Sequence, residues 1–141
     1  MKIAFLTPEF PHPKTGISGG IGTSIFNLSK GLVQQGHQVS ILVYSQNEDE
    51  VFKDNGVTFY RIKNIKLKGF SRFLTQNKIQ RLINNLVKNN KIDILEAPDW
   101  TGITSRITVK CPVVVKLNGS DTYFCYLDKR PVKFLNQFNE K

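Results

Sequence analysis

The sequence is poor in the residues that build disulfide scaffolds and metal centres. Its 141 residues include only two cysteines, two histidines, one methionine and one tryptophan. Cys111 and Cys125 are too few for a disulfide framework, and no metal-ligand spacing occurs, so we expect neither a metal nor a cofactor. No apolar run reaches the ~18 residues of a membrane-spanning helix. Residues 1–10 do not form a signal-peptide pattern, and a reducing cytoplasm is the expected location.

The residues that are present are typical of one globular α/β domain. Hydrophobic residues make up 40% and charged residues 22% of the chain. Apolar runs predict strands at residues 2–7, 39–44, 57–62, 92–97 and 113–117, and helical spacing predicts helices at 23–35 and 71–90. We also expect an acidic polar loop at 46–54, a short helix at 100–108 and a last helix from Pro131. The alternation predicts a Rossmann-like domain, with a parallel sheet of at least five strands and helices on both faces.

The formal net charge of +9 comes from one stretch of the chain. Residues 61–91 hold nine basic residues and no acid, whereas the rest of the chain is balanced. Cations alternate there with apolar side chains, a pattern that can lie on an anionic membrane surface. The membrane-surface candidates are Lys63, Lys66, Lys68, Phe70, Arg72 and Phe73. The alternative is a solvated helix face with core residues. Nucleic acid is disfavoured because no nucleic-acid motif accompanies the charge.

A glycine-rich loop precedes the first predicted helix. The amides of Gly20 and Gly22 can approach a ligand closely, and a helix N-terminus favours an anion. Thr23 or Ser24 can cap the helix or bind a phosphate oxygen, and the alternative is a flexible loop with an ordinary cap. A dinucleotide fingerprint fails because Ile25 stands where Gly or Ala is needed, which disfavours an NAD-dependent oxidoreductase.

Two further polar loops follow predicted strands. Glu96 and Asp99 flank a proline beside Trp100, so carboxylates and an indole are available to a sugar, although Asp99 can equally cap a helix and Trp100 can be core. Asn118 and Gly119 follow the strand at 113–117, and the Asn118 amide can both donate and accept hydrogen bonds. The alternative is a simple turn in which Ser120 or Asp121 caps the next helix.

Four segments together resemble the N-terminal domain of family-4 glycosyltransferases, which have the two-lobed GT-B fold. They are KIAFLTPEFPHP, GGIGTSIFNLSKGLVQQGHQVSILV, DILEAPDW and PVVVKLNGSD, and they extend from Lys2 to Asp121. The resemblance implies transfer of a sugar, with retention, from a nucleotide-sugar donor to a glycan or lipid-linked acceptor. It implies that residues 1–141 form the acceptor-side domain, and that the lobe holding most of the nucleotide site and its paired glutamates is not in this chain.

The resemblance also implies roles for individual residues. Gly20, Gly22 and Thr23 would lie near the donor diphosphate, where amides stabilise the leaving group. Glu96, Asp99, Trp100, Asn118, Gly119 and Asp121 would line the acceptor side of the cleft. Many relatives have histidine where this chain has Asn118, and asparagine carries no proton charge near neutral pH. We therefore expect the 141 residues alone to be inactive, and the alternative is a non-catalytic binding or regulatory module of the same fold.

Overall fold

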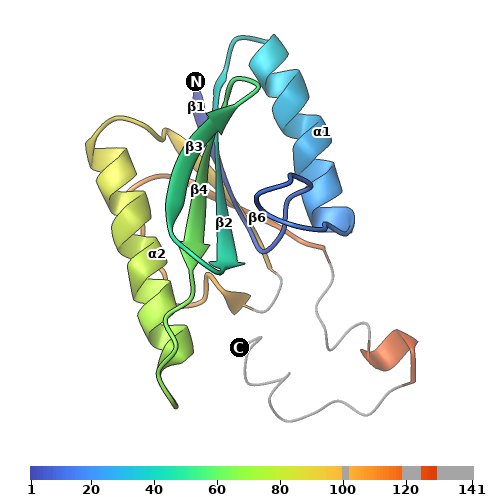
Figure 1. The fold of residues 1–141 in the computed structure, drawn as a ribbon, viewed down its shortest axis with the longest axis vertical. Coiled ribbons are helices and arrows are strands. Elements are labelled where there is room, and N and C mark those ends of the chain that lie inside the picture. The colour runs from blue at the N-terminus through green and yellow to red at the C-terminus, as the bar shows by residue number, and fades with distance from the viewer. Residues whose placement is uncertain (100–101, 119–124, 130–141) are drawn as a thin grey trace.

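The computed structural model describes residues 1–99, 102–118 and 125–129 (Figure 1). In chain order the elements are β1 (Lys2–Thr7), α1 (Gly20–Gln34), β2 (Gln38–Gln46), β3 (Glu50–Asp54), β4 (Val57–Lys63), α2 (Ser71–Lys88), β5 (Ile94–Pro98) and β6 (Val113–Lys116). The five predicted strands and the two long predicted helices are all present. Within the described residues, no helix is long and apolar enough to cross a membrane.

The strands form one six-stranded sheet in the order β3-β4-β2-β1-β5-β6. All neighbouring pairs are parallel except β3 with β4. Strand β1 lies between β2 and β5, so Phe5 of β1 is level with Ile41 of β2 and Glu96 of β5. The chain moves outward from β1 through α1 to β2, and then returns through α2 to β5 on the other side of β1. The strand order therefore reverses between β1 and β5.

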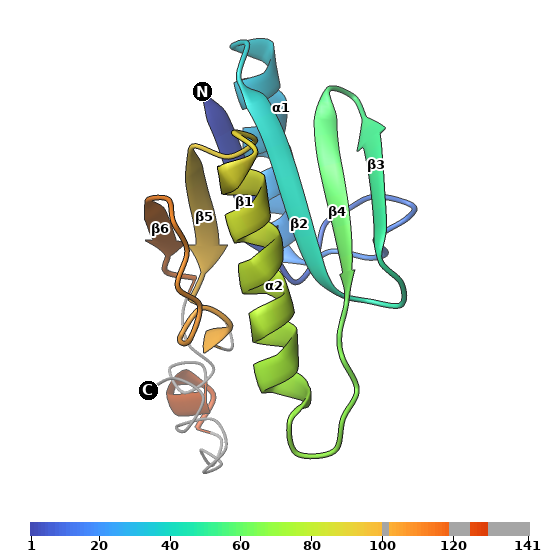
Figure 2. The same ribbon diagram turned by 90° about the vertical axis from the view of Figure 1, so that its left-hand side faces the viewer.

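The sheet is covered on both faces, as predicted (Figure 2). Strand β1 shows the division, because successive side chains of a strand point to opposite faces. Phe5 belongs to the cluster that contains Ile25 of α1. Leu6 belongs to the other cluster, with Ile79 and Ile83 of α2. Each of these side chains is at most 3% exposed, and a fully buried side chain of this size contributes about 1.5–3 kcal/mol to folding.

Both long helices end where the sequence predicts, through the same backbone motif. Gly36 follows α1 with a φ of +80°; its N–H donates to Val33 O, and the N–H of His37 donates to Leu32 O. Asn90 has the same place after α2, with a φ of +56°. A residue in the left-handed region reverses the chain and lets these N–H groups satisfy the last helical carbonyls.

The predicted loop at 46–54 is wrong, because residues 50–54 form the edge strand β3. Strand β3 pairs antiparallel with β4 through a two-residue turn at Asn55 and Gly56, whose φ values are +47° and +80°. Asparagine and glycine favour this turn because both adopt positive φ. The strand is hard to recognise in the sequence because Val51 and Phe52 are its only apolar residues and charged residues flank them, and an edge strand tolerates such exposure.

Three other local predictions fare differently. Helix α1 begins at Gly20 rather than residue 23, and two of its apolar side chains, Phe26 and Leu28, are each 42% exposed. Of the predicted short helix at 100–108, the described part consists of i→i+3 turns of the 3₁₀ type up to residue 107 and contains no α-helix. The last predicted helix, from Pro131, lies outside the described residues.

The hairpin turn leads to a stability prediction. An alanine in place of Gly56 would carry a Cβ in the left-handed region, 2.9 Å from Val33 Cγ1. We expect Gly56→Ala to lower the free energy of unfolding by about 1–2 kcal/mol. Gly31→Ala is the matched control, because its Cβ meets no atom within 4 Å in the interior of α1, and we expect it to stabilise by about 0.5–1 kcal/mol. Urea unfolding measures both, and equal effects would contradict the prediction.

Candidate functional site

The reversal of strand order places a candidate site at the carboxyl ends of β1, β5 and β6. Open parallel sheets bind ligands where loops leave strands on either side of such a reversal. Here β1 leads into the loop before α1, β5 ends at Pro98, and β6 ends at Lys116. The start of α1, which is the lower end of that helix in Figure 1, is directed toward the same edge.

The loop between β1 and α1 is held by Glu9, a residue that the sequence analysis did not single out. The Thr7 hydroxyl donates to Glu9 O at 2.8 Å, and Glu9 Oε1 accepts the N–H of Gly22 at 3.1 Å. A Cβ on Gly22 would lie 2.7 Å from Glu9 O, so the close packing of this loop requires glycine. The carboxylate of Glu9 thus satisfies one of the orphan amides at the start of α1.

Thr23 and Ser24 do not cap α1, which corrects one of the predicted alternatives. The residue before α1 is Gly19, and it makes no side-chain capping bond. Thr23 Oγ1 instead donates to Gly19 O at 2.8 Å, and Ser24 Oγ accepts from Lys116 Nζ at 2.8 Å. The predicted cap failed because the helix begins three residues earlier than its apolar pattern indicates.

Two groups of positive character lie at the start of α1, next to the Glu9 carboxylate that binds Gly22. Among the described residues, the N–H groups of Gly20 and Ile21 have no hydrogen-bond acceptor, as expected for the first residues of a helix. Lys116 adds a full positive charge beside Ser24 in the first turn. Gly20 and Thr23 are exposed there, and a Cβ on Gly20 would meet no atom within 4 Å. This surface can receive an anion. Lys116 was missed although it lies at the end of a predicted strand.

The structure places three of the predicted cleft residues at this edge. Glu96 of β5 is half-buried, with Phe5 and Val114 as its register partners. Asp99 Oδ1 accepts the N–H of Asn118 at 2.9 Å, and Asn118 Nδ2 donates to Lys116 O at 3.1 Å. Asp99 and Asn118 therefore tie the exits of β5 and β6 together.

The other three predicted cleft residues, Trp100, Gly119 and Asp121, lie outside the described residues. The cavity that touches Glu96, Lys116 and Asn118 has a volume of only about 10 Å³. That is room for about one water molecule, so the described residues form an open wall here rather than an enclosed pocket. Within the described ranges, no three His, Cys, Asp or Glu side chains gather to hold a metal ion.

The basic stretch is partly neutralised by residues before β4. Arg61 NH1 contacts Glu48 and Glu50, and Lys78 Nζ contacts Asp49. Burial alone would raise the pKa of Asp49. Hydrogen bonds from Lys78 and from the Lys63 N–H outweigh this effect, and the pKa of Asp49 is lower than its usual value. Arg61 and Lys78 are therefore paired with acidic residues at 48–50. Residues 61–91 contain no acid in the sequence, but acidic side chains from another segment lie beside them in the fold.

Two exposed lysines and three exposed apolar side chains lie together around the connection between β4 and α2, at the same edge of the sheet. Lys66 and Lys68 are exposed, and so are three apolar side chains around them: Leu67 is 53%, Phe70 62% and Phe73 47% exposed. We call these five residues the loop patch. Arg72, another predicted member, is half-buried and donates to Gly102 O at 2.9 Å. Lys63 is exposed, and its N–H donates to Asp49.

Internal hydrogen bonds fix the connection that carries the loop patch. Ser71 Oγ donates to Leu67 O at 2.7 Å and accepts the Leu67 N–H at 2.8 Å. Thr75 Oγ1 accepts the N–H of Ile65 at 3.0 Å. These bonds hold the backbone of the connection in place, so the exposed apolar side chains are presented by an ordered segment.

Comparison with known proteins agrees with the resemblance seen in the sequence. A glycosyltransferase from Methanocaldococcus jannaschii, MJ1607, is 27% identical; the match covers 89% of this chain and 33% of that protein. Among solved structures, one described as "Trehalose-6-phosphate from E. coli bound with UDP-2-fluoro glucose" aligns with a TM-score of 0.48 and 9% identity over 89% of this chain and 35% of the other. The chain thus spans about a third of each of these proteins.

The family model described as Glycosyltransferase Family 4 matches residues 18–141. This range contains α1, α2 and strands β2 to β6. This match confirms the family inferred from the four sequence segments. The chain therefore belongs to Glycosyltransferase Family 4.

Proposed function

We propose that this chain is the acceptor-side lobe of a retaining glycosyltransferase that takes its sugar from a nucleotide-sugar donor. Family membership supports sugar transfer. The observation that carries the proposal is the exposed start of α1 with Lys116 beside it. A glycosyl donor leaves as a nucleoside diphosphate, and the negative charge that develops on it needs positive partners.

The first turn of α1 offers the diphosphate three kinds of partner. The amides of Gly20 and Ile21 are directed donors, the hydroxyl of Thr23 is exposed, and the Lys116 ammonium supplies charge. Glu9 is itself anionic, but its carboxylate is engaged with Gly22 and so leaves the two earlier amides to the ligand. In this proposal the second lobe, outside the 141 residues, binds the nucleoside and brings the diphosphate to α1.

The acceptor would lie beside Glu96, Asp99 and Asn118. Among the residues that the structure describes, none forms a hydrogen bond or ion pair with the Glu96 side chain, so its carboxylate is the best placed of the three to accept a bond from an acceptor hydroxyl. Asp99 and Asn118 shape the exits of β5 and β6. The proposal extends to Trp100, Gly119 and Asp121, which follow or flank these residues in the chain.

The loop patch supports a second element of the proposal, a lipid-linked acceptor at an anionic membrane surface. Two lysines surround three exposed apolar side chains on an ordered segment, which combines electrostatic attraction with shallow insertion. The patch is on the same edge of the sheet as the candidate site. A membrane bound there would hold an acceptor headgroup near the cleft.

Charge at the start of α1 can be tested in the full-length protein. We expect Lys116→Gln to raise the KM for the nucleotide sugar roughly tenfold, because one charge-assisted contact to the diphosphate is lost. Lys110→Gln is the control for loss of one lysine charge, since Lys110 is exposed and precedes β6 at the opposite end of the strand. An unchanged KM in Lys116→Gln would remove Lys116 from the donor site. No turnover of any nucleotide sugar by the full-length protein would overturn the proposed function.

Substitutions of Gly20 and Gly22 test separately the close approach of the donor and the packing of the loop. We expect Gly22→Ala to lower the free energy of unfolding by about 1–3 kcal/mol, because its Cβ meets the backbone of Glu9 at 2.7 Å. Gly20→Ala has open space around its Cβ, so its unfolding should be unchanged or slightly more stable, while its KM for donor rises because the methyl group covers the amides. Thermal unfolding and donor kinetics on both variants measure this. A normal KM in Gly20→Ala would contradict close approach of the diphosphate.

Membrane attachment is tested by co-sedimentation with vesicles containing phosphatidylglycerol. We expect the double change Lys66→Gln and Lys68→Gln to weaken binding by about 2 kcal/mol at low salt, at about 1 kcal/mol per lysine. We expect Phe70→Ser to weaken the binding that persists at high salt. Val51→Ser, which alters a side chain 63% exposed on β3, is the control. Equal and negligible binding of the unaltered chain at low and high salt would refute this element.

A further inference from the structure

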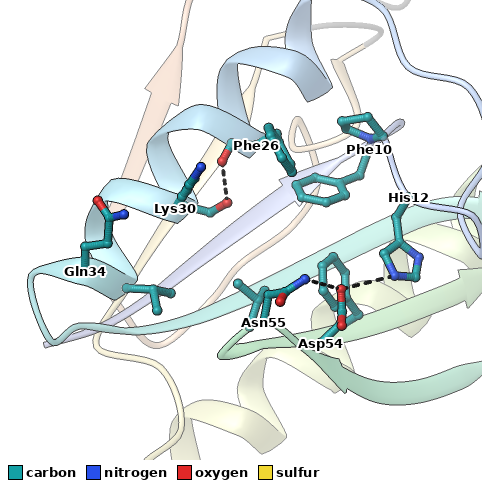
Figure 3. A pocket seen from close by; sticks show the side chains of 12 residues that line it. Phe10, His12, Phe26, Lys30, Gln34, Asp54 and Asn55 are labelled. Carbon is teal, nitrogen blue, oxygen red and sulfur yellow. Dashed lines mark hydrogen bonds and ion pairs between the residues drawn. The ribbon is translucent and has the colours of Figure 1, made fainter.

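A separate pocket of about 430 Å³ lies between α1 and the turn that joins β3 to β4 (Figure 3). Its volume is in the range of small-ligand sites. The residues around it come from three segments: the loop after β1, the second half of α1, and the β3–β4 hairpin. Gly20, at the candidate donor site, is ten residues from Lys30, which is about 15 Å along the helix. The pocket is thus distinct from the edge where transfer is proposed.

The floor of the pocket is aromatic. Phe10 and Phe59 are each 3% exposed and meet edge to face, with ring centroids 5.1 Å apart. Phe26 lies beside them at 6.0 Å from Phe10 and is 42% exposed. Phe26 is a large apolar residue of the helix, and its exposure above buried aromatic rings is a departure from the ordinary amphipathic pattern.

The rim of the pocket is polar on both sides. Lys30 and Gln34 are one helical turn apart on α1, and Asp54 and Asn55 lie across from them on the hairpin (Figure 3). The side chains of Lys30 and Gln34 make no hydrogen bond to any part of the chain that the structure describes. Asn55 Nδ2 donates to Asp54 Oδ2 at 2.8 Å, which leaves the Asn55 carbonyl oxygen available as an acceptor.

The charges on the rim balance. Lys30 supplies one positive charge and Asp54 one negative charge, and His12 Nε2 lies 3.6 Å from Asp54 Oδ2. An anionic ligand would be repelled by Asp54, and a cationic ligand would be repelled by Lys30. A purely apolar ligand would leave Lys30, Gln34 and Asn55 without hydrogen-bond partners as it covered them. The lining therefore selects a neutral ligand that has an apolar face and several hydroxyl groups at its edge.

We propose that this pocket binds one ring of a neutral saccharide, at a site separate from the transfer cleft. The C–H groups on one face of a sugar ring carry partial positive charge and stack on the negative face of an aromatic ring such as Phe26. The hydroxyls at the ring edge would then reach the amides of Gln34 and Asn55, which both donate and accept, and the charged ends of Lys30 and Asp54. The proposal stands on the lining of this pocket and does not require the donor site to act as proposed.

The test is a nuclear magnetic resonance titration of the full chain with neutral trisaccharides of glucose, mannose and galactose. At least one of them should shift the side-chain amide signals of Gln34 and Asn55 with a Kd below about 10 mM, the weak end of recognition. We expect Phe26→Ala to weaken this binding roughly tenfold. Leu28→Ala is the matched control, since Leu28 is on the same helix with the same 42% exposure but does not line the pocket, and its Kd should be unchanged.

A second variant and two further ligands complete the experiment. Asn55→Gly removes the amide while glycine accepts the φ of +47°, so the turn is kept and saccharide binding should weaken. UDP-glucose should shift the backbone signals of Gly20 to Ser24 instead, which tests the donor site independently. Absence of any saccharide shift at Gln34 and Asn55, equal binding by Phe26→Ala, or occupation of the pocket by hexanol alone would overturn the proposal.

Discussion

The structure depends on burying β1 on both faces while it is paired along both edges. Phe5 faces α1, and Ala4 and Leu6 face α2, so one short strand belongs to both hydrophobic clusters. Its backbone is bonded to β2 on one side and β5 on the other. A strand in this position has no solvent-facing side, which is why its sequence is a continuous apolar run. The helices must then cross on opposite faces, and the loops after β1 and β5 meet at one edge.

That meeting point explains why polar residues from distant parts of the chain come together. Glu9 follows β1, Asp99 follows β5, and Lys116 ends β6, yet all three act on the same few loops. Glu9 and Asp99 use their carboxylates to hold backbone N–H groups, which makes them parts of the framework. The exposed amides at the start of α1 and the Lys116 ammonium are what remains to meet a ligand.

Charge is distributed by the fold in a way that the chain order conceals. The acidic residues at 48–50 come before the basic stretch, but the β3–β4 hairpin brings them against Arg61 and Lys78. Hydrogen bonds from Lys14 and Arg61 lower the pKa of Glu50 below its ordinary value. Lys66 and Lys68, in the connection between β4 and α2, have no such acidic partner among the described residues and lie beside Leu67, Phe70 and Phe73.

Local patterns in the sequence were enough to predict the parallel strands, both long helices and the place where each helix stops at its C-terminal end. Apolar runs and helical spacing indicate directly which side chains are buried. Gly36 and Asn90 favour the left-handed conformation that ends a helix. These two kinds of local signal do not depend on contacts with distant parts of the chain. Strand β3 escaped prediction because an edge strand gains its stability from pairing with β4, which its charged sequence does not reveal. The cap on Gly22, the cation beside Ser24 and the pocket between α1 and the hairpin each join segments far apart in the chain. Such contacts are decided by how the layers pack, because no local sequence pattern encodes the distance between two separate elements.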